Sequence, residues 1–213
     1  MSISDEHCPA SPTVLMDNEA LEGFLAVAID EYRLITPESP IPCFALAIGI
    51  IDARAIHVRR LAFGNNARRS DPAARREFAE SIVPRFGPAY ENESRGWWMD
   101  SRDLLKASRE AEAEGLEIIG SIHMHPDWHR LGPPCERGVV LSERPTPMDR
   151  YVFGRTAWPV NLICYLECRA GVMYYALACW APPPADRPGD GSAELPLRIR
   201  TVAGEAARME VGV

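Results

Sequence analysis

The feature that most constrains the fold is an apolar run that ends in two histidines. Residues 118–122, Ile-Ile-Gly-Ser-Ile, lead directly into His123-Met124-His125-Pro126. A short apolar run of this kind is typical of a buried strand. Residues at i and i+2 of a strand point to the same face, so the two imidazoles can converge on one ion. The sequence therefore predicts a central strand that carries a metal site at its end.

The composition is that of an ordinary folded protein. The chain has 213 residues, of which 46% are hydrophobic and 25% charged, and we expect one main domain. No stretch approaches the roughly 20 apolar residues of a membrane span, and the first residues lack the basic and apolar regions of a signal peptide. The net charge is −7 with scattered basic residues. We therefore expect a cytoplasmic protein that binds neither membranes nor nucleic acid.

Hydrophobic periodicity predicts helices that alternate with strands. The expected helices cover residues 21–32, 73–83 and 101–114, with a short one after Asp149, and the expected strands besides the metal strand cover 43–52, 56–63, 160–167 and 172–180. This order predicts a layered α/β or α+β domain over residues 17–181. Residues 1–16 are expected to form a flexible leader. Residues 182–213 are expected to form a Pro/Gly-rich linker and an extension with an edge strand near residues 195–201.

Zinc suits two histidines on one face of a strand. A catalytic zinc ion has three protein ligands and leaves a fourth position open. Thr146-Pro147-Met148-Asp149 has the pattern of a capped helix start, and Asp149 could supply the third ligand. Asp127 is the main alternative for that ligand, and His129 is more simply a polar loop residue.

These motifs together resemble the JAMM (JAB1/MPN/Mov34) metalloprotease family. The family pattern is a Glu, then His-x-His-Pro and Ser-x-x-Asp, and this chain has Glu38, His123-x-His125-Pro126 and Thr146-x-x-Asp149 in the same order. The resemblance covers roughly residues 18–181. It implies an MPN/JAB domain, in which a cytidine-deaminase-like mixed sheet is flanked by helices.

The resemblance also implies a role for each motif residue. His123, His125 and Asp149 would hold Zn²⁺, Glu38 would be the general base, and Thr146 would donate a hydrogen bond to the oxyanion. The chain departs from the family pattern in two places. Asp149 lies 24 positions after His125 instead of eleven, which indicates an insertion that could contact substrate. The sequence Ser-Pro-Ile-Pro separates Glu38 from the strand, and Glu31 is the alternative base.

The implied function is a zinc peptidase or isopeptidase that cuts after the C-terminal tail of a ubiquitin-like protein. The chain is similar to prokaryotic JAMM enzymes, which remove such proteins from conjugates or process ubiquitin-like and sulfur-carrier precursors, in some cases within antiphage conjugation systems. E1- or E2-like proteins are expected partners. A non-catalytic MPN scaffold is the alternative. A metallo-β-lactamase-like site is disfavoured because Trp128 stands where that family has a histidine.

Overall fold

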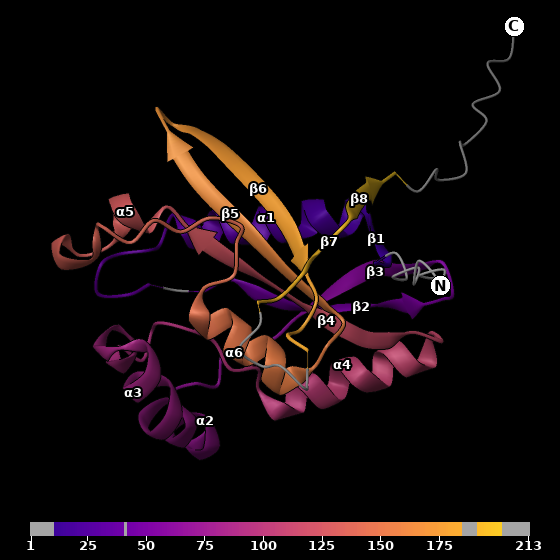
Figure 1. Ribbon diagram of the computed structural model, residues 1–213, viewed down its shortest axis with the longest axis horizontal. Helices are drawn as coiled ribbons and strands as arrows, with labels where there is room; N and C mark the ends of the chain where they lie inside the picture. The colour runs from indigo at the N-terminus through magenta and orange to yellow at the C-terminus, as the bar shows by residue number, and fades with distance from the viewer. Residues whose placement is uncertain (1–10, 41, 185–190, 202–213) are drawn as a thin grey trace, which may run out of the picture.

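A mixed β-sheet with helices on both faces forms the body of the protein (Figure 1). The computed structural model describes residues 11–40, 42–184 and 191–201. The strands are β1 (Thr13–Asp17), β2 (Phe44–Ile51), β3 (Ala55–Phe63), β4 (Glu117–Pro126), β5 (Val160–Arg169), β6 (Val172–Trp180), β7 (Glu194–Leu195) and β8 (Leu197–Arg200). The helices are α1 (Asn18–Tyr32), α2 (Pro72–Glu77), α3 (Val83–Phe86), α4 (Ser101–Ala113), α5 (Trp128–Leu131) and α6 (Pro147–Thr156). The expected mixed α/β architecture is confirmed at this level.

The strand order is β7-β6-β5-β4-β2-β3-β1-β8. β4 lies near the centre, antiparallel to β2 and parallel to β5. A parallel neighbour requires a long crossover, and residues 127–159, which include α5 and α6, provide it. The predicted metal strand is therefore buried between two partners.

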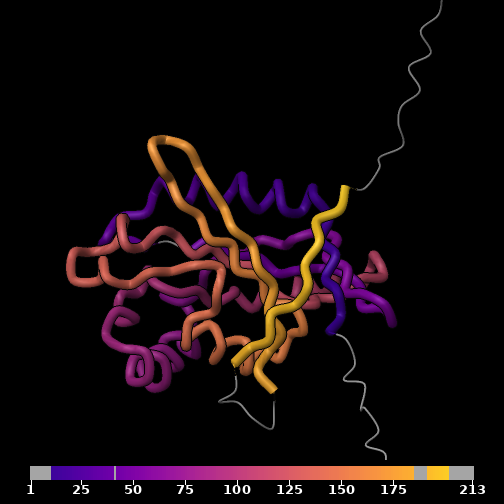
Figure 2. Tube along the Cα trace, turned by 45° about the horizontal axis from the view of Figure 1, so that its top comes forward, coloured from indigo at the N-terminus to yellow at the C-terminus, as the bar shows by residue number. Residues whose placement is uncertain are grey.

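Two hydrophobic cores lie on opposite faces of the sheet. α1 buries its apolar side, including Phe24 and Ala28, against one face. α4 packs Ala107 and Ala111 against the other face, where α6 places Phe153. Figures 1 and 2 show α4 and α6 on the side of the sheet opposite α1. None of the described helices is long and apolar enough to span a membrane.

The C-terminal strands join the two edges of the sheet. β7 pairs with β6 at one edge, and after Pro196 the chain continues as β8, which pairs with β1 at the other. Val14 N donates a hydrogen bond of 2.7 Å to the Pro196 carbonyl oxygen. The predicted C-terminal edge strand is thus confirmed, while the proposed linker falls partly on residues 185–190, outside the described residues.

The expected leader is wrong where it overlaps β1. Thr13–Asp17 pairs with β3 and β8, and Val14 and Met16 are fully buried. Residues 1–10 lie outside the described part of the chain. Asp17 precedes α1 but makes no capping hydrogen bond, because its carboxylate pairs with Arg200 and Arg59.

The second predicted helix is longer and less regular than expected. α2 continues as a π-helical turn over Phe78–Ile82 and then as α3, which ends at Phe86. Pro84 does not end the helix; it is the second residue of α3, directly after the π-helical turn. The predicted 101–114 helix is confirmed as α4, whose start is capped by the Asp100 carboxylate.

Candidate metal centre

β4 places both histidines on one face at its C-terminal end. His123 lies opposite Phe44 of β2, and His125 lies opposite Tyr165 of β5. Both histidines are buried. The rings of Trp97 and Phe153 lie 6.4 and 6.3 Å from the His123 ring, centroid to centroid. Alternation along the strand and aromatic packing thus fix both imidazoles with little access to water.

A capping box at the start of α6 aims Asp149 at these histidines. Asp149 Oδ2 accepts hydrogen bonds from the Thr146 N–H and from Thr146 Oγ1, each at 2.6 Å. Thr146 Oγ1 in turn accepts from Asp149 N at 3.2 Å. The carboxylate therefore has a fixed orientation before any ligand binds.

The three side chains have the spacing that a tetrahedral zinc site needs. His123 Nε2 lies 3.0 Å from His125 Nε2, and Asp149 oxygens lie 3.3 Å from each of these nitrogens. Zinc–ligand bonds of about 2.0–2.1 Å give tetrahedral ligand–ligand separations of roughly 3.3 Å. Within the described part of the chain, these residues are the one group of three or more His, Cys, Asp or Glu close enough to share an ion. The donor set fits zinc.

The hydrogen bond at Nδ1 of His125 favours metal binding through Nε2 of the same ring. His125 Nδ1 lies 2.8 Å from the Ser142 carbonyl oxygen. A carbonyl can only accept, so Nδ1 carries a proton, which leaves Nε2 as the ring atom that can bind an ion. His123 Nδ1 is buried and has no hydrogen-bond partner among the described residues. One of the two histidines thus has the supporting contact that is common at metal sites.

Electrostatics keep Asp149 ionised. Burial alone would raise the pKa of Asp149, but His125 and His123 outweigh it and hold this pKa well below its usual value. Burial lowers the pKa of His123. Burial acts in the same direction on His125, but Asp149 and the Ser142 carbonyl outweigh it and raise the pKa of His125. The site therefore holds a charged carboxylate beside two imidazoles.

Thr146 is predicted to support the site through Asp149. Thr146→Val should weaken zinc binding by about 10- to 100-fold, because the carboxylate loses its side-chain hydrogen bond. Thr146→Ser keeps the hydroxyl and should bind zinc like the wild type. Competition with a chromophoric chelator measures both affinities. Equal affinities for the valine and serine variants would contradict the role given to Thr146.

The predicted role of Thr146 as an oxyanion donor is not supported. A threonine hydroxyl carries one proton, and that proton is directed to Asp149 Oδ2. Thr146 lines the cavity, but its one hydroxyl proton is already used in the hydrogen bond to Asp149. The helix cap, which the sequence pattern also predicted, accounts for this geometry.

A cavity of about 110 Å³ opens in front of the three side chains. Its walls are mostly apolar and include Trp97, Met148 and Phe153. Asp149 is the one carboxylate that lines it among the residues that the structure describes. Within the described ranges, the three candidate ligands therefore line the cavity without a second carboxylate beside them that could serve as a general base.

The structure does not bring Glu38 or Glu31 to this cavity. Glu38 is exposed, and its backbone carbonyl oxygen accepts a hydrogen bond from Asn92 Nδ2. Pro40 and Pro42, from the same connector, do line the cavity. Glu31 lies on α1, where burial raises its pKa, and one of its carboxylate oxygens is buried without a hydrogen-bond partner among the described residues.

Asp127 is excluded as the third ligand in this geometry. Its carboxylate is fully buried and accepts a hydrogen bond of 2.7 Å from the Tyr32 hydroxyl. Arg130 lies 3.9 Å from its other oxygen. His129 is also absent from the group that could share an ion. Of the candidates weighed from the sequence, Asp149 alone joins the two histidines.

The inserted segment after Pro126 forms one wall of the cavity, and this arrangement was not evident from the sequence. Trp128 is buried, lines the cavity and donates through Nε1 to Glu136 Oε2 at 2.9 Å. Glu136 also pairs with Arg95, whose guanidinium lies over the rings of Tyr90 and Trp128. No sequence motif marks Tyr90, Arg95 or Glu136.

Comparisons with known proteins address the fold and leave the activity open. No model of a known protein family matches the chain, and no curated protein matches it in sequence. Among solved structures, the solution structure of protein DSY2949 from Desulfitobacterium hafniense is similar, with 18% sequence identity and a TM-score of 0.50. The match covers 89% of this chain and 94% of that chain. At this identity the similarity concerns the fold alone.

Proposed function

We propose that this protein is a JAMM-type zinc peptidase or isopeptidase, with an MPN/JAB domain, that cleaves after the C-terminal tail of a ubiquitin-like protein. One observation carries the proposal. His123, His125 and Asp149, which the sequence pattern singles out, converge with separations of 3.0–3.3 Å at the wall of a cavity. Two imidazoles and one carboxylate are a ligand set that catalytic zinc sites use.

Bound zinc would supply a Lewis acid and lower the pKa of a coordinated water toward about 7. The protein's own residues prepare the site for this chemistry. Thr146 orients Asp149, and Ser142 sets the tautomer of His125. Trp97, Trp128 and Phe153 line the cavity with apolar surface, which excludes water and strengthens electrostatic interactions inside.

Glu38 remains the proposed general base. It lies two residues before Pro40, so the connector that carries it forms the rim of the cavity. Catalytic hydrogen bonds are often incomplete before substrate binds. A substrate tail that contacts this connector could bring the Glu38 carboxylate to the reacting atoms. Its exposed position also supports the competing proposal, a non-catalytic MPN scaffold.

The narrow cavity supports a substrate tail of small residues. Its volume of about 110 Å³ leaves little room for bulky side chains beside the metal ligands. Such a tail belongs to ubiquitin-like and sulfur-carrier proteins, so the reaction would be deconjugation or precursor processing. E1- or E2-like proteins, including those of bacterial antiphage conjugation systems, are the partners that this activity implies.

Cleavage of a ubiquitin-like fusion tests this proposal. Zinc-loaded wild type should release the C-terminal extension, and Glu38→Gln should lower kcat by about 10²- to 10⁴-fold without loss of zinc. Glu31→Gln is the matched control and should retain activity. A zinc-loaded wild type that cuts no fusion would favour the scaffold. Equal activity of wild type and Glu38→Gln would remove Glu38 from the mechanism.

A further inference from the structure

The outer edge of β6 is unpaired along most of its length among the described residues. β7 pairs only with Cys179 and Trp180, so residues 172–178 have a partner strand, β5, on one side alone. Figures 1 and 2 show the β5–β6 hairpin extending beyond the body of the molecule. A row of unpaired N–H and C=O groups is a template for another strand.

This edge lacks the features that usually prevent pairing. β6 reads Val-Met-Tyr-Tyr-Ala-Leu-Ala-Cys-Trp and contains no charged residue and no proline. Val172, Tyr174 and Tyr175 are 53%, 52% and 54% exposed. Edge strands are commonly protected by lysine, proline or a bulge. An uncharged edge of this length indicates that a partner covers it.

The backbone groups that face outward can be identified from the end of the strand. Ala181 N donates a hydrogen bond of 2.8 Å to Ala193 O, across the same edge. In an antiparallel pair, every second residue directs both N–H and C=O to one side. Met173, Tyr175 and Leu177 therefore direct theirs outward, while the residues between them bond to β5.

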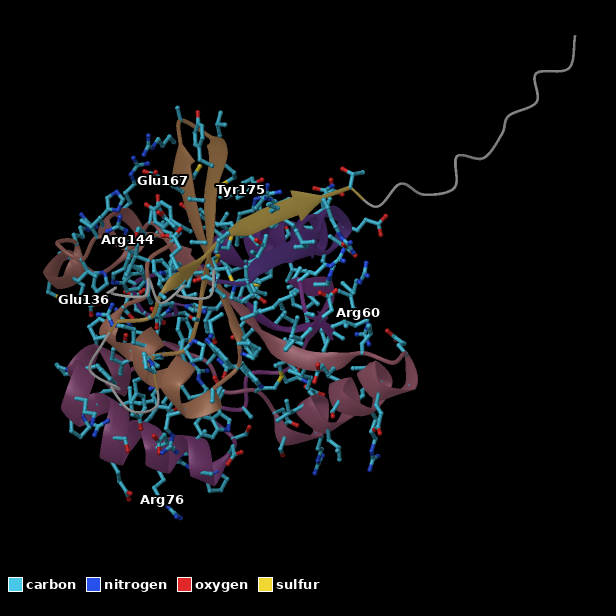
Figure 3. The ribbon with its side chains drawn as sticks, turned by 45° about the vertical axis from the view of Figure 1, so that its right-hand side comes forward. Arg60, Arg76, Glu136, Arg144, Glu167 and Tyr175 are labelled. Carbon is cyan, nitrogen blue, oxygen red and sulfur yellow. The ribbon has the colours of Figure 1, made fainter. Side chains whose placement is uncertain are left out.

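We propose that β6 pairs antiparallel with β6 of a second copy of this chain, joining two sheets across a two-fold axis at Tyr174 or Tyr175. With either axis, residues that direct their backbone N–H and C=O outward lie opposite such residues of the second copy, as a symmetric interface requires. Because β6 has no charges, its pairing with itself brings no like charges together. On the neighbouring strand β5, Glu167 pairs with Arg169 at 2.6 Å and also meets Arg130 at 3.1 Å. Figure 3 shows Glu167 and Tyr175 on opposite sides of the hairpin.

The distance from the metal centre argues against a scissile substrate tail at this edge. A strand added to β6 would be the third strand away from β4. Three strand spacings separate the added strand from β4 by about 14 Å. Its peptide bonds would lie beyond the reach of His123, His125 and Asp149. The edge is therefore a separate surface, and the inference does not depend on the proposed function.

Analytical ultracentrifugation of the wild type and three lysine variants tests whether β6 pairs with β6 of a second copy. The wild type should sediment with twice the mass of one chain over a concentration series. Tyr174→Lys and Tyr175→Lys should each weaken the dimer by at least about tenfold, because lysines opposite or diagonal to each other repel. The substitution with the larger loss locates the axis. Leu105→Lys, at a similarly exposed position on α4, is the control and should leave the dimer intact.

Amide hydrogen exchange provides a second test that needs no variant. In the wild type, the amides of Met173 and Tyr175 should become protected as concentration rises, and that of Leu177 with them when the axis lies at Tyr175, while those of Tyr174 and Ala176 are protected throughout by β5. A wild type that stays monomeric would overturn the proposal. So would a dimer that resists both lysine substitutions, or amides at positions 173, 175 and 177 that exchange at one rate at all concentrations.

Discussion

Replacing His125 with alanine should weaken zinc binding by more than about 100-fold. Loss of a supporting contact around a metal ligand costs about 10- to 100-fold, and loss of the ligand itself must cost more. His125 lies 3.0 Å from His123 and 3.3 Å from Asp149, so its removal leaves two ligands. Competition against a chelator of known affinity gives the dissociation constants of both proteins.

His129→Ala is the matched control for this substitution. His129 lies four residues further along the chain and outside the group that could share an ion. Its replacement should leave the zinc affinity unchanged. An equal loss for both variants would indicate a general effect on the fold, and no loss for His125→Ala would remove this residue from the metal site.

Phe24→Ala should lower the free energy of unfolding by about 3–5 kcal/mol, the usual range for truncation of a buried phenylalanine. Phe24 is fully buried between α1 and the sheet and stacks on Phe63 with ring centroids 6.2 Å apart. The substitution leaves a cavity that neighbouring strands cannot readily fill. Urea unfolding followed by circular dichroism measures the loss.

Leu34→Ala is the control for this core substitution. Leu34 follows α1 and is 63% exposed, so its truncation should change the free energy of unfolding by no more than about 0.5 kcal/mol. Similar losses for the two variants would show that α1 does not form the main core on its face of the sheet.

The sequence was most informative where local patterns determine the structure. The apolar run before His123 predicted β4, and alternation along that strand predicted that His123 and His125 share a face. The Thr146-Pro147 cap pattern predicted the start of α6, and the same capping box holds Asp149. Asp149 lies 24 positions after His125, and it could be grouped with the two histidines because each belongs to a recognisable local motif.

Other features depend on tertiary contacts that no local pattern encodes. β1 looked like a leader because five residues carry little signal, and its pairing with β3 and β8 provides the burial. The contacts of Glu136 with Trp128 and Arg95 join two loops that are distant in the sequence. The position of Glu38 depends on how a proline-rich connector crosses the surface. These features became evident only when the chain was folded.

The most direct test of the metal centre is zinc content by elemental analysis, on wild type and Asp149→Ala purified side by side without added metal. We predict one zinc per chain in the wild type and much less in the variant, because Asp149 is the carboxylate that meets both histidines. Asp127→Asn, at the buried carboxylate that meets Tyr32, should retain the metal. A wild type without zinc, or an Asp149→Ala protein that keeps it, would contradict the proposed site.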